Sequence, residues 1–161
     1  MVSELGLKKL VNEWGHLFSQ HDKPEELLAI CYLTSEGQPD FIWWDKEYFK
    51  HEGGSPLAQR VSSQKQVPPE KLFLRLGLFA ICLYDLIRLK IPARNIFEPE
   101  ENAQLAKKLL DATDYVSSSK RVFKYLMPYK TISKRATLHN GQKQALSVIE
   151  EILTKGREML G

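Results

Sequence analysis

The chain has 161 residues, of which 43% are hydrophobic and 27% are charged. This length and balance are typical of one compact domain and exclude general disorder. Its 23 basic and 20 acidic residues give a net charge of only +3, which excludes an extremely basic tail protein. We therefore expect a single domain over residues 1–161, while the total charge alone indicates no class of partner.

Cysteine content and hydropathy limit the cellular setting. Cys31 and Cys82 both lie in apolar runs, which favours two buried free thiols over a disulfide or a zinc site. The first residues lack the pattern of a secretory signal. The most apolar segment, residues 72–89, is interrupted by three charged residues, and its uncharged runs are too short to cross a bilayer. We expect a soluble cytoplasmic protein with no membrane partner.

Two helices are expected at the start of the chain. Apolar residues recur at helical spacing between residues 3 and 19, and Ser3 is a suitable N-cap. Pro24 begins the second helix, which we extend to Leu33. Residues 27–33 also fit a strand that forms a hairpin with residues 41–44, and this alternative stays open.

Residues 34–69 contain most of the glycines and prolines of the first half of the chain. The pattern predicts one long irregular insertion, with a small hairpin as the alternative. A structureless loop of this length is unusual inside a compact domain. We therefore expect the aromatic cluster at residues 41–49 to form a short ordered piece that holds the insertion against the core.

Four further helices are expected in the second half. A central helix over residues 68–90 is apolar around most of its circumference and ends before Pro92. Helical spacing predicts the others over residues 98–112, 117–127 and 140–159. The expected fold class is therefore all-α, a compact bundle of five to six helices with the insertion at residues 34–69.

The charge is unevenly distributed along the chain. Residues 1–114 sum to −3 and residues 150–161 to −1, whereas residues 115–149 hold seven basic residues and no acidic one. The seven are Lys120, Arg121, Lys124, Lys130, Lys134, Arg135 and Lys143. Because like charges repel, a stretch of this kind favours a polyanion as partner. We call residues 115–149 the acid-free segment.

Other residues of the acid-free segment are also suited to binding nucleic acid. Helical spacing places Lys120, Arg121 and Lys124 on one side of a helix. Tyr125 and Tyr129 can stack on unpaired bases, and nearby hydroxyls can contact phosphates. No base-reading motif is present, so any contact is expected to be independent of sequence. A solvated basic face and a patch for an acidic protein remain the alternatives.

Catalysis is not expected. His16, His21 and Asp22 could contribute to a metal-dependent hydrolase, but companion ligands are missing at suitable spacing, so a polar pair at a helix end is favoured. The carboxylates of the insertion, Asp40, Asp45, Glu47 and Glu52, are interpreted as solvated. Trp43 and Trp44 are equally consistent with a stacking platform, an interface anchor or core packing. We expect no enzyme activity and no cofactor.

The whole pattern resembles a known family. The size, the helical prediction, the apolar residues 72–89, the segment at 90–116 and the basic stretch at 117–135 resemble the small subunit of Cascade-type CRISPR effector complexes. More narrowly, they resemble the helical C-terminal part of the large subunit of type I-D systems.

This resemblance implies a non-catalytic role. The chain would hold the guide–target duplex or the displaced strand through backbone contacts, while base pairing supplies specificity. Its partners would be other CRISPR effector subunits, copies of itself, guide RNA and target DNA. The alternative is a protein-interaction or adaptor module with a basic docking face, anchored by Trp43, Trp44, Tyr48 and Phe49.

Overall fold

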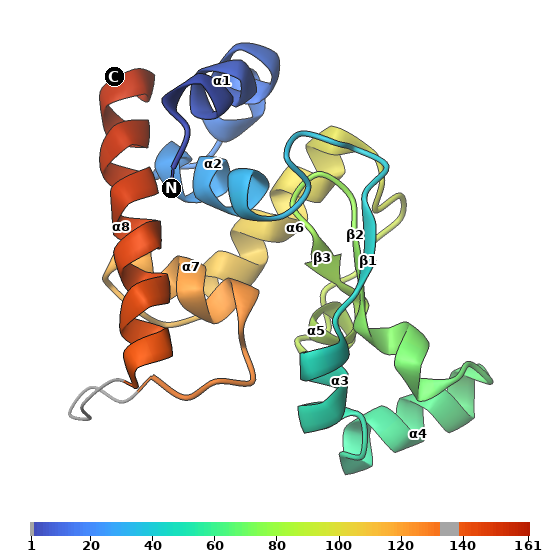
Figure 1. Cartoon of the computed structure of the whole chain (residues 1–161). Coiled ribbons are helices and arrows are strands. Elements are labelled where there is room, and N and C mark those ends of the chain that lie inside the picture. Colours follow the sequence, from blue (N-terminus) through green and yellow to red (C-terminus); the bar gives the residue numbers. More distant parts are fainter. Residues whose placement is uncertain (1, 133–138) are drawn as a thin grey trace.

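The computed structural model describes residues 2–132 and 139–161, which form a mostly helical structure with one small antiparallel sheet (Figure 1). The helices are α1 (Glu4–Phe18), α2 (Pro24–Leu33), α3 (Lys46–Glu52), α4 (Pro56–Lys65), α5 (Leu83–Arg88), α6 (Pro99–Asp111), α7 (Ser118–Leu126) and α8 (Asn140–Leu160), with a 3-10 helix, η1 (Pro69–Phe73). The strands are β1 (Ile42–Trp44), β2 (Leu74–Leu76) and β3 (Ile81–Cys82).

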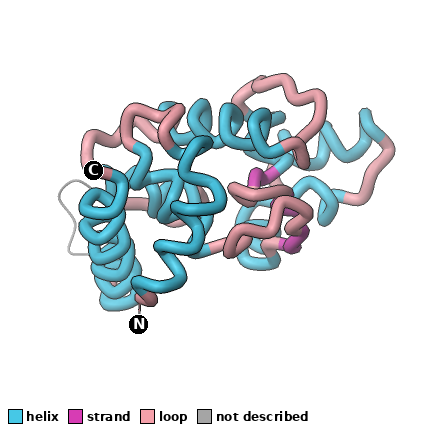
Figure 2. Tube along the Cα trace, turned by 90° about the horizontal axis from the view of Figure 1, so that it is seen from above, coloured by secondary structure: helices cyan, strands magenta, loops and turns pink. Residues whose placement is uncertain are grey.

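Helices α1, α2, α6, α7 and α8 form one region, which we call the helical body. Each helix buries its apolar side in a common core that includes Leu28, Phe123 and Ile152. Gly156 lets α8 approach α2 closely, because a Cβ there would lie 3.0 Å from Leu28 Cδ2. Seen from above, α8, which ends at the labelled C-terminus, lies at one side of the molecule, and the strands lie toward the other (Figure 2).

Helical spacing predicted all five helices of the body to within one residue at each end. The capping residues explain why the ends of these helices could be predicted from the sequence. Ser3 Oγ accepts the backbone N–H of Gly6 at 3.0 Å, and the Glu98 carboxylate accepts the N–H groups of Glu100 and Glu101. Side chains of this type satisfy the free donors of a first helical turn.

The strands, α3, α4, η1 and α5 form a second region, which we call the sheet unit. The strand order is β1-β2-β3, and Arg75 at the centre of β2 lies opposite Trp43 on one side and Cys82 on the other. A separate small core packs beside it, in which the rings of Tyr48, Phe73 and Tyr84 lie 4.8–5.8 Å apart.

The prediction of a long irregular insertion was wrong. Residues 34–69 contain β1, α3 and α4, and the strand at 42–44 pairs with β2, whereas residues 27–33 belong to α2. Asp45 and Ser55 cap the two short helices by accepting the N–H groups of Tyr48 and Ala58. Pro56 occupies the first turn of α4, where a missing N–H costs nothing. Asp45, Ser55 and Pro56 thus lie at the starts of helices and not in an irregular loop.

The predicted central helix over residues 68–90 was also wrong, and with it the purely all-α fold class. This segment divides into η1, β2, β3 and α5. Gly77 has a φ of +83°, and a Cβ there would lie 2.2 Å from Asn102 Nδ2. Asn102 accepts the N–H of Phe79 and donates to the carbonyls of Leu76 and Ile96. These side-chain hydrogen bonds take the place of the backbone hydrogen bonds of a helix. The apolar segment therefore forms a hairpin of β2 and β3.

Both cysteines are buried and free, as predicted. Cys31 lies in the core of the helical body and Cys82 in that of the sheet unit. Among the described residues, no helix combines the length and apolar character needed to cross a bilayer.

Candidate nucleic-acid interface

Helix α7 carries the first three of the predicted basic contacts. Val122 and Phe123 are completely buried against the body, which leaves Lys120 and Lys124 partly exposed on other sides of the helix. The side chain of Arg121 is only 11% exposed. A phosphate contact requires an accessible cation, which the largely buried Arg121 does not offer.

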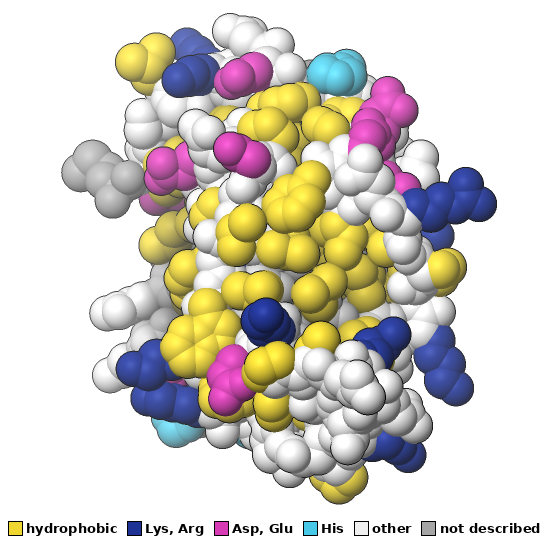
Figure 3. Space-filling view, turned by 90° about the vertical axis from the view of Figure 1, so that its right-hand side faces the viewer, with side chains coloured by type: hydrophobic (Ala, Val, Ile, Leu, Met, Phe, Trp, Pro, Cys, Tyr) yellow, Lys and Arg dark blue, Asp and Glu magenta, His cyan; other side chains and the backbone are white. Residues whose placement is uncertain are grey.

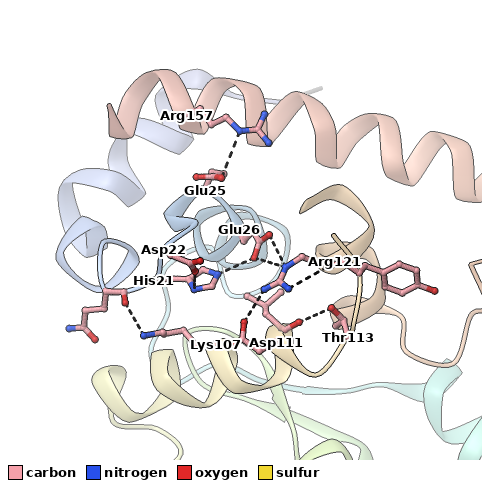
Figure 4. A network of polar contacts seen from close by, with 12 residues as sticks. His21, Asp22, Glu25, Glu26, Lys107, Asp111, Thr113, Arg121 and Arg157 are labelled. Carbon is pink, nitrogen blue, oxygen red and sulfur yellow. Dashed lines mark hydrogen bonds and ion pairs between the residues drawn. The ribbon is translucent and has the colours of Figure 1, made fainter. Parts of the chain in front are cut away.

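Arg121 belongs to a network of ionic contacts inside the helical body (Figure 4). Its Nε donates to both carboxylate oxygens of Glu26 at 3.0 and 3.2 Å, and one terminal nitrogen lies 3.1 Å from Asp111. His21 Nε2 lies 3.0 Å from the same Glu26 carboxylate. This arginine therefore joins α7 to α2 and α6 rather than facing solvent.

Burial would by itself raise the pKa of the Glu26 carboxyl. Hydrogen bonds from His21 and Ser118 and the charge of Arg121 outweigh burial and hold the pKa below its ordinary value. Glu26 is thus an ionised carboxylate at neutral pH, and its side chain is completely buried. A buried charge of this kind is tolerated only when it is paired and hydrogen-bonded.

Lys124 also makes internal contacts. Its Nζ donates to the carbonyls of Pro128 and Lys130 at 2.8 and 3.1 Å and so fixes the turn that follows α7. Burial lowers its pKa, and the charge of Arg88 lowers it further. The lysine lies at a notch of about 250 Å³ that also holds Arg88, Glu52 and Asp85, so positive and negative charges are balanced there.

The remaining predicted contacts are distributed along the rest of the acid-free segment. Lys120 and Lys130 are partly exposed and Lys143 is exposed on α8, and none of the three makes an ion pair with another described residue. Lys134 and Arg135 lie outside the described residues.

The histidines do not form the arrangement that a metal hydrolase needs. His21 contacts Asp22 and Glu26, both at 3.0 Å, whereas His16 stacks on Trp14. Within residues 2–132 and 139–161, no group of three or more histidine, cysteine or acidic side chains is suited to hold a metal ion. The pair His21–Asp22 is instead part of the ionic network around Glu26.

An apolar groove separates the sheet unit from the acid-free segment. It has a volume of about 380 Å³. The acid-free segment supplies Leu126, Met127, Tyr129, Ala145, Val148 and Ile149, and the other side consists of Trp43, Asp45, Glu47 and Arg75, with Leu33 and Thr34 at the end of α2. Sequence reasoning did not bring these two sets together, because a contact between residues so far apart in the chain leaves no local signal.

A buried ion pair lies at one side of this groove. Arg75 is 1% exposed, and its Nε donates to Asp45 Oδ2 at 2.8 Å. Its other nitrogens donate to the carbonyls of Ala80 and Leu126. Because Leu126 ends α7, Arg75 joins the sheet unit to the helical body.

Two aromatic side chains line the groove, and a lysine lies beside one of them. Trp43 is 50% exposed on the sheet side, and Tyr129 lies on the acid-free side with Lys130 Nζ 5.9 Å from its ring centre. Asp45 is neutralised by Arg75, and the Glu47 carboxylate lies 3.8 Å from Lys50. The groove thus presents the exposed ring of Trp43, whereas the Tyr129 ring is stacked on Tyr48 with their centres 5.6 Å apart.

Comparisons with protein-family models, curated proteins and solved structures gave no match to this chain.

Proposed function

We propose that the chain is a non-catalytic subunit that holds single-stranded nucleic acid in the apolar groove, through contacts that are independent of sequence. The supporting observation is the half-exposed ring of Trp43 in a groove whose other wall has no acidic residue and includes Tyr129, with Lys130 Nζ 5.9 Å from the Tyr129 ring centre. Stacking on such side chains contributes about 1–3 kcal/mol per base and tolerates every base.

The distribution of charge agrees with this assignment. One complete wall of the groove comes from the acid-free segment, which repels no phosphate along its length. Lys120, Lys130 and Lys143 are the cations of this segment that supply phosphate contacts, together with Lys134 and Arg135. Arg121 and Lys124 act indirectly, since they position α7 and the turn after it.

The resemblance to Cascade-type small subunits extends the proposal to an assembly. In such a complex the displaced DNA strand is single-stranded, and its bases are free to stack in a groove. The partners proposed are therefore other CRISPR effector subunits, copies of the chain, guide RNA and target DNA. Base pairing with the guide would read the sequence, and this chain would hold the backbone and the unpaired bases.

Two adjacent tryptophans offer a matched test. Successive side chains of a strand point to opposite faces, so Trp43 faces the groove and Trp44 does not. Titration of a fluorescently labelled single-stranded oligonucleotide measures binding by anisotropy at several salt concentrations. We expect Trp43→Ala to weaken binding by about tenfold, as loss of one stacking contact implies. Trp44→Ala, which removes an equally large exposed side chain, should bind like the wild type.

Charge variants test the phosphate contacts separately. Lys130→Glu should weaken binding and reduce its dependence on salt, because fewer counterions are released. Lys9→Glu, at an exposed position of α1 that does not line the groove, is the control of equal charge change. Equal loss of binding in both tryptophan variants would contradict the groove as the binding site.

The alternative function is an adaptor in which the same groove takes an apolar segment of a protein. Its supporting observation is the predominantly apolar lining of the groove beside the half-exposed Trp43. Absence of any oligonucleotide binding at low salt, with a protein partner that Trp43→Ala loses and Trp44→Ala retains, would favour the adaptor over the nucleic-acid subunit.

A further inference from the structure

Strand β1 lies at the edge of the sheet and pairs only with β2 among the described residues. Phe41 accepts the N–H of Gly77 at 2.8 Å, and Asp45 donates its N–H to Phe73 at 2.9 Å. In an antiparallel ladder the bonded residues alternate along a strand. The N–H and C=O groups of Ile42 and Trp44 therefore point away from β2, toward the open edge.

The side chains at this edge are apolar as well as exposed. Ile42 is 61% exposed and Trp44 39%, and both lie on the face of the sheet that also bears Leu74 and Leu76. Figure 3 shows hydrophobic side chains gathered across the middle of the side that carries the sheet. Edge strands are usually protected by a charge, a proline or a bulge, and residues 42–44 have none of these.

The residues around β1 are self-complementary. When two copies of the strand pair antiparallel about Trp43, Ile42 of each copy lies opposite Trp44 of the other. This register makes both residues hydrogen-bonded positions, so all four outward groups of each strand find partners. It also places exposed Asp40 of each copy beside exposed Lys46 of the other. Neither of these residues makes an ion pair with another described residue.

We propose that β1 is a homodimerisation edge, through which two copies of this chain join their sheets into one six-stranded sheet about a two-fold axis. The interface is isologous, since the same residues contribute from both copies. The backbone of β1 supplies the hydrogen bonds, and Ile42 and Trp44 supply apolar contact on one face. This inference does not depend on the proposed function, because it uses the edge of the sheet and not the binding of a ligand.

A charge exchange tests the register. Sedimentation velocity over a series of concentrations gives the dissociation constant of the dimer. Asp40→Lys and Lys46→Asp should each raise that constant several-fold, because each places like charges together at two symmetric points. The double variant restores opposite charges and should return the constant close to that of the wild type. A wild-type chain that stays monomeric at every concentration overturns the proposal, as does a double variant no better than either single one.

Ile42→Pro tests the backbone pairing without disturbing β2. The Ile42 N–H points outward, so proline removes a donor that the fold does not use, and circular dichroism checks that the helices remain. We expect a monomer. A folded Ile42→Pro variant with an unchanged dissociation constant would show that the copies associate elsewhere and would overturn the proposal.

Disulfide formation gives a geometric check. The Cα atoms of a pair without hydrogen bonds lie about 4.5 Å apart, within the range that a disulfide spans. Trp43→Cys should therefore join two copies when a mild oxidant is added, while buried Cys31 and Cys82 stay reduced. Trp44→Cys is the matched control, because position 44 of each copy lies opposite Ile42 of the other and the two new thiols do not meet. Equal cross-linking of both variants, or of neither, contradicts the register.

Discussion

The helical body and the sheet unit differ in how their cores are assembled. The core of the body draws on five helices from both ends of the chain, together with Leu78, Phe79 and Ile81 of the hairpin. The sheet unit draws mainly on residues 48–87, and aromatic rings and a few buried polar groups fill its small core. Each region contains a buried arginine, but Arg121 stays within the body whereas Arg75 also bonds across to it.

This difference indicates which interactions stabilise each region. In the helical body many apolar side chains share the stabilisation, so the loss of one contact removes a small part of it. In the sheet unit the core is small, so each polar contact supplies a larger part of the stability. Tyr48 donates to Asp85 at 2.5 Å, and burial followed by the Asp85 charge raises the pKa of the tyrosine. We therefore expect substitutions of the same kind to lower the free energy of unfolding more in the sheet unit than in the helical body.

The largest effect is expected from Arg75. Arg75→Met removes the counter-charge of the buried Asp45 carboxylate, which keeps only its hydrogen bond from the Tyr48 N–H, and this costs about 3–5 kcal/mol of unfolding free energy. It also frees the Leu126 carbonyl at the end of α7. Urea denaturation followed by circular dichroism measures the loss. The control is Arg60→Met on the exposed face of α4, which should change stability by less than about 0.5 kcal/mol.

The corresponding substitution in the helical body is Glu26→Gln. The amide keeps the shape but not the charge that Arg121 contacts, so we expect a loss of about 1.5–3 kcal/mol at pH 7. The pKa of Glu26 is lower in the folded chain than its ordinary value of 4.5. The stabilisation by the charge is therefore complete above pH 4.5 and disappears as the pH falls through the folded pKa.

Denaturation at several pH values measures this second effect. The difference in unfolding free energy between the wild type and Glu26→Gln should stay constant at neutral pH and shrink at acidic pH. A difference that grows as the pH falls would contradict the assignment of Glu26 as the ionised partner of Arg121.

The same contrast explains what the sequence could predict. The helices of the body follow from spacing and caps such as Ser3 and Glu98, which act within one turn. The strands are only two or three residues long, too short for an alternating pattern to be distinguished from a buried helix. Their position depends on Asn102, more than twenty residues away, whose side chain replaces the backbone partners of the hairpin.

For the candidate interface, the sequence identified the residue types but not their partners. Six residues of the acid-free segment line one wall of the groove, and the aromatic cluster at 41–49 contributes Trp43, Asp45 and Glu47 to the other, although the sequence predicted no groove. It did not predict that Arg121 and Lys124 would face inward, because Glu26 and the carbonyl of Pro128 are brought to them only by tertiary folding.

The two cysteines report on the opening of each region. Burial raises the pKa of both thiols to about 12, so neither reacts while its core stays closed. Variants that retain one thiol, Cys82→Ala and Cys31→Ala, allow each to be followed by a thiol reagent under native conditions. We expect Cys82 to react several-fold faster than Cys31, because the smaller core opens at lower free energy. Equal rates would indicate that both regions open together.

The smallest effects are expected from the two serine caps. Ser3→Ala and Ser55→Ala each remove a hydroxyl that accepts an N–H of the first helical turn, and each should cost about 1 kcal/mol. Ser55 should cost more, since its hydroxyl also lies 3.2 Å from the Tyr84 hydroxyl within the sheet unit. Trp14 fluorescence follows α1, and Trp43 and Trp44 follow the sheet. If the regions unfold separately, Ser55→Ala advances only the transition of the sheet tryptophans. If they unfold as one unit, both variants shift a single transition, and contacts between the regions such as Arg75–Leu126 and Asn102–Leu76 then make it cooperative.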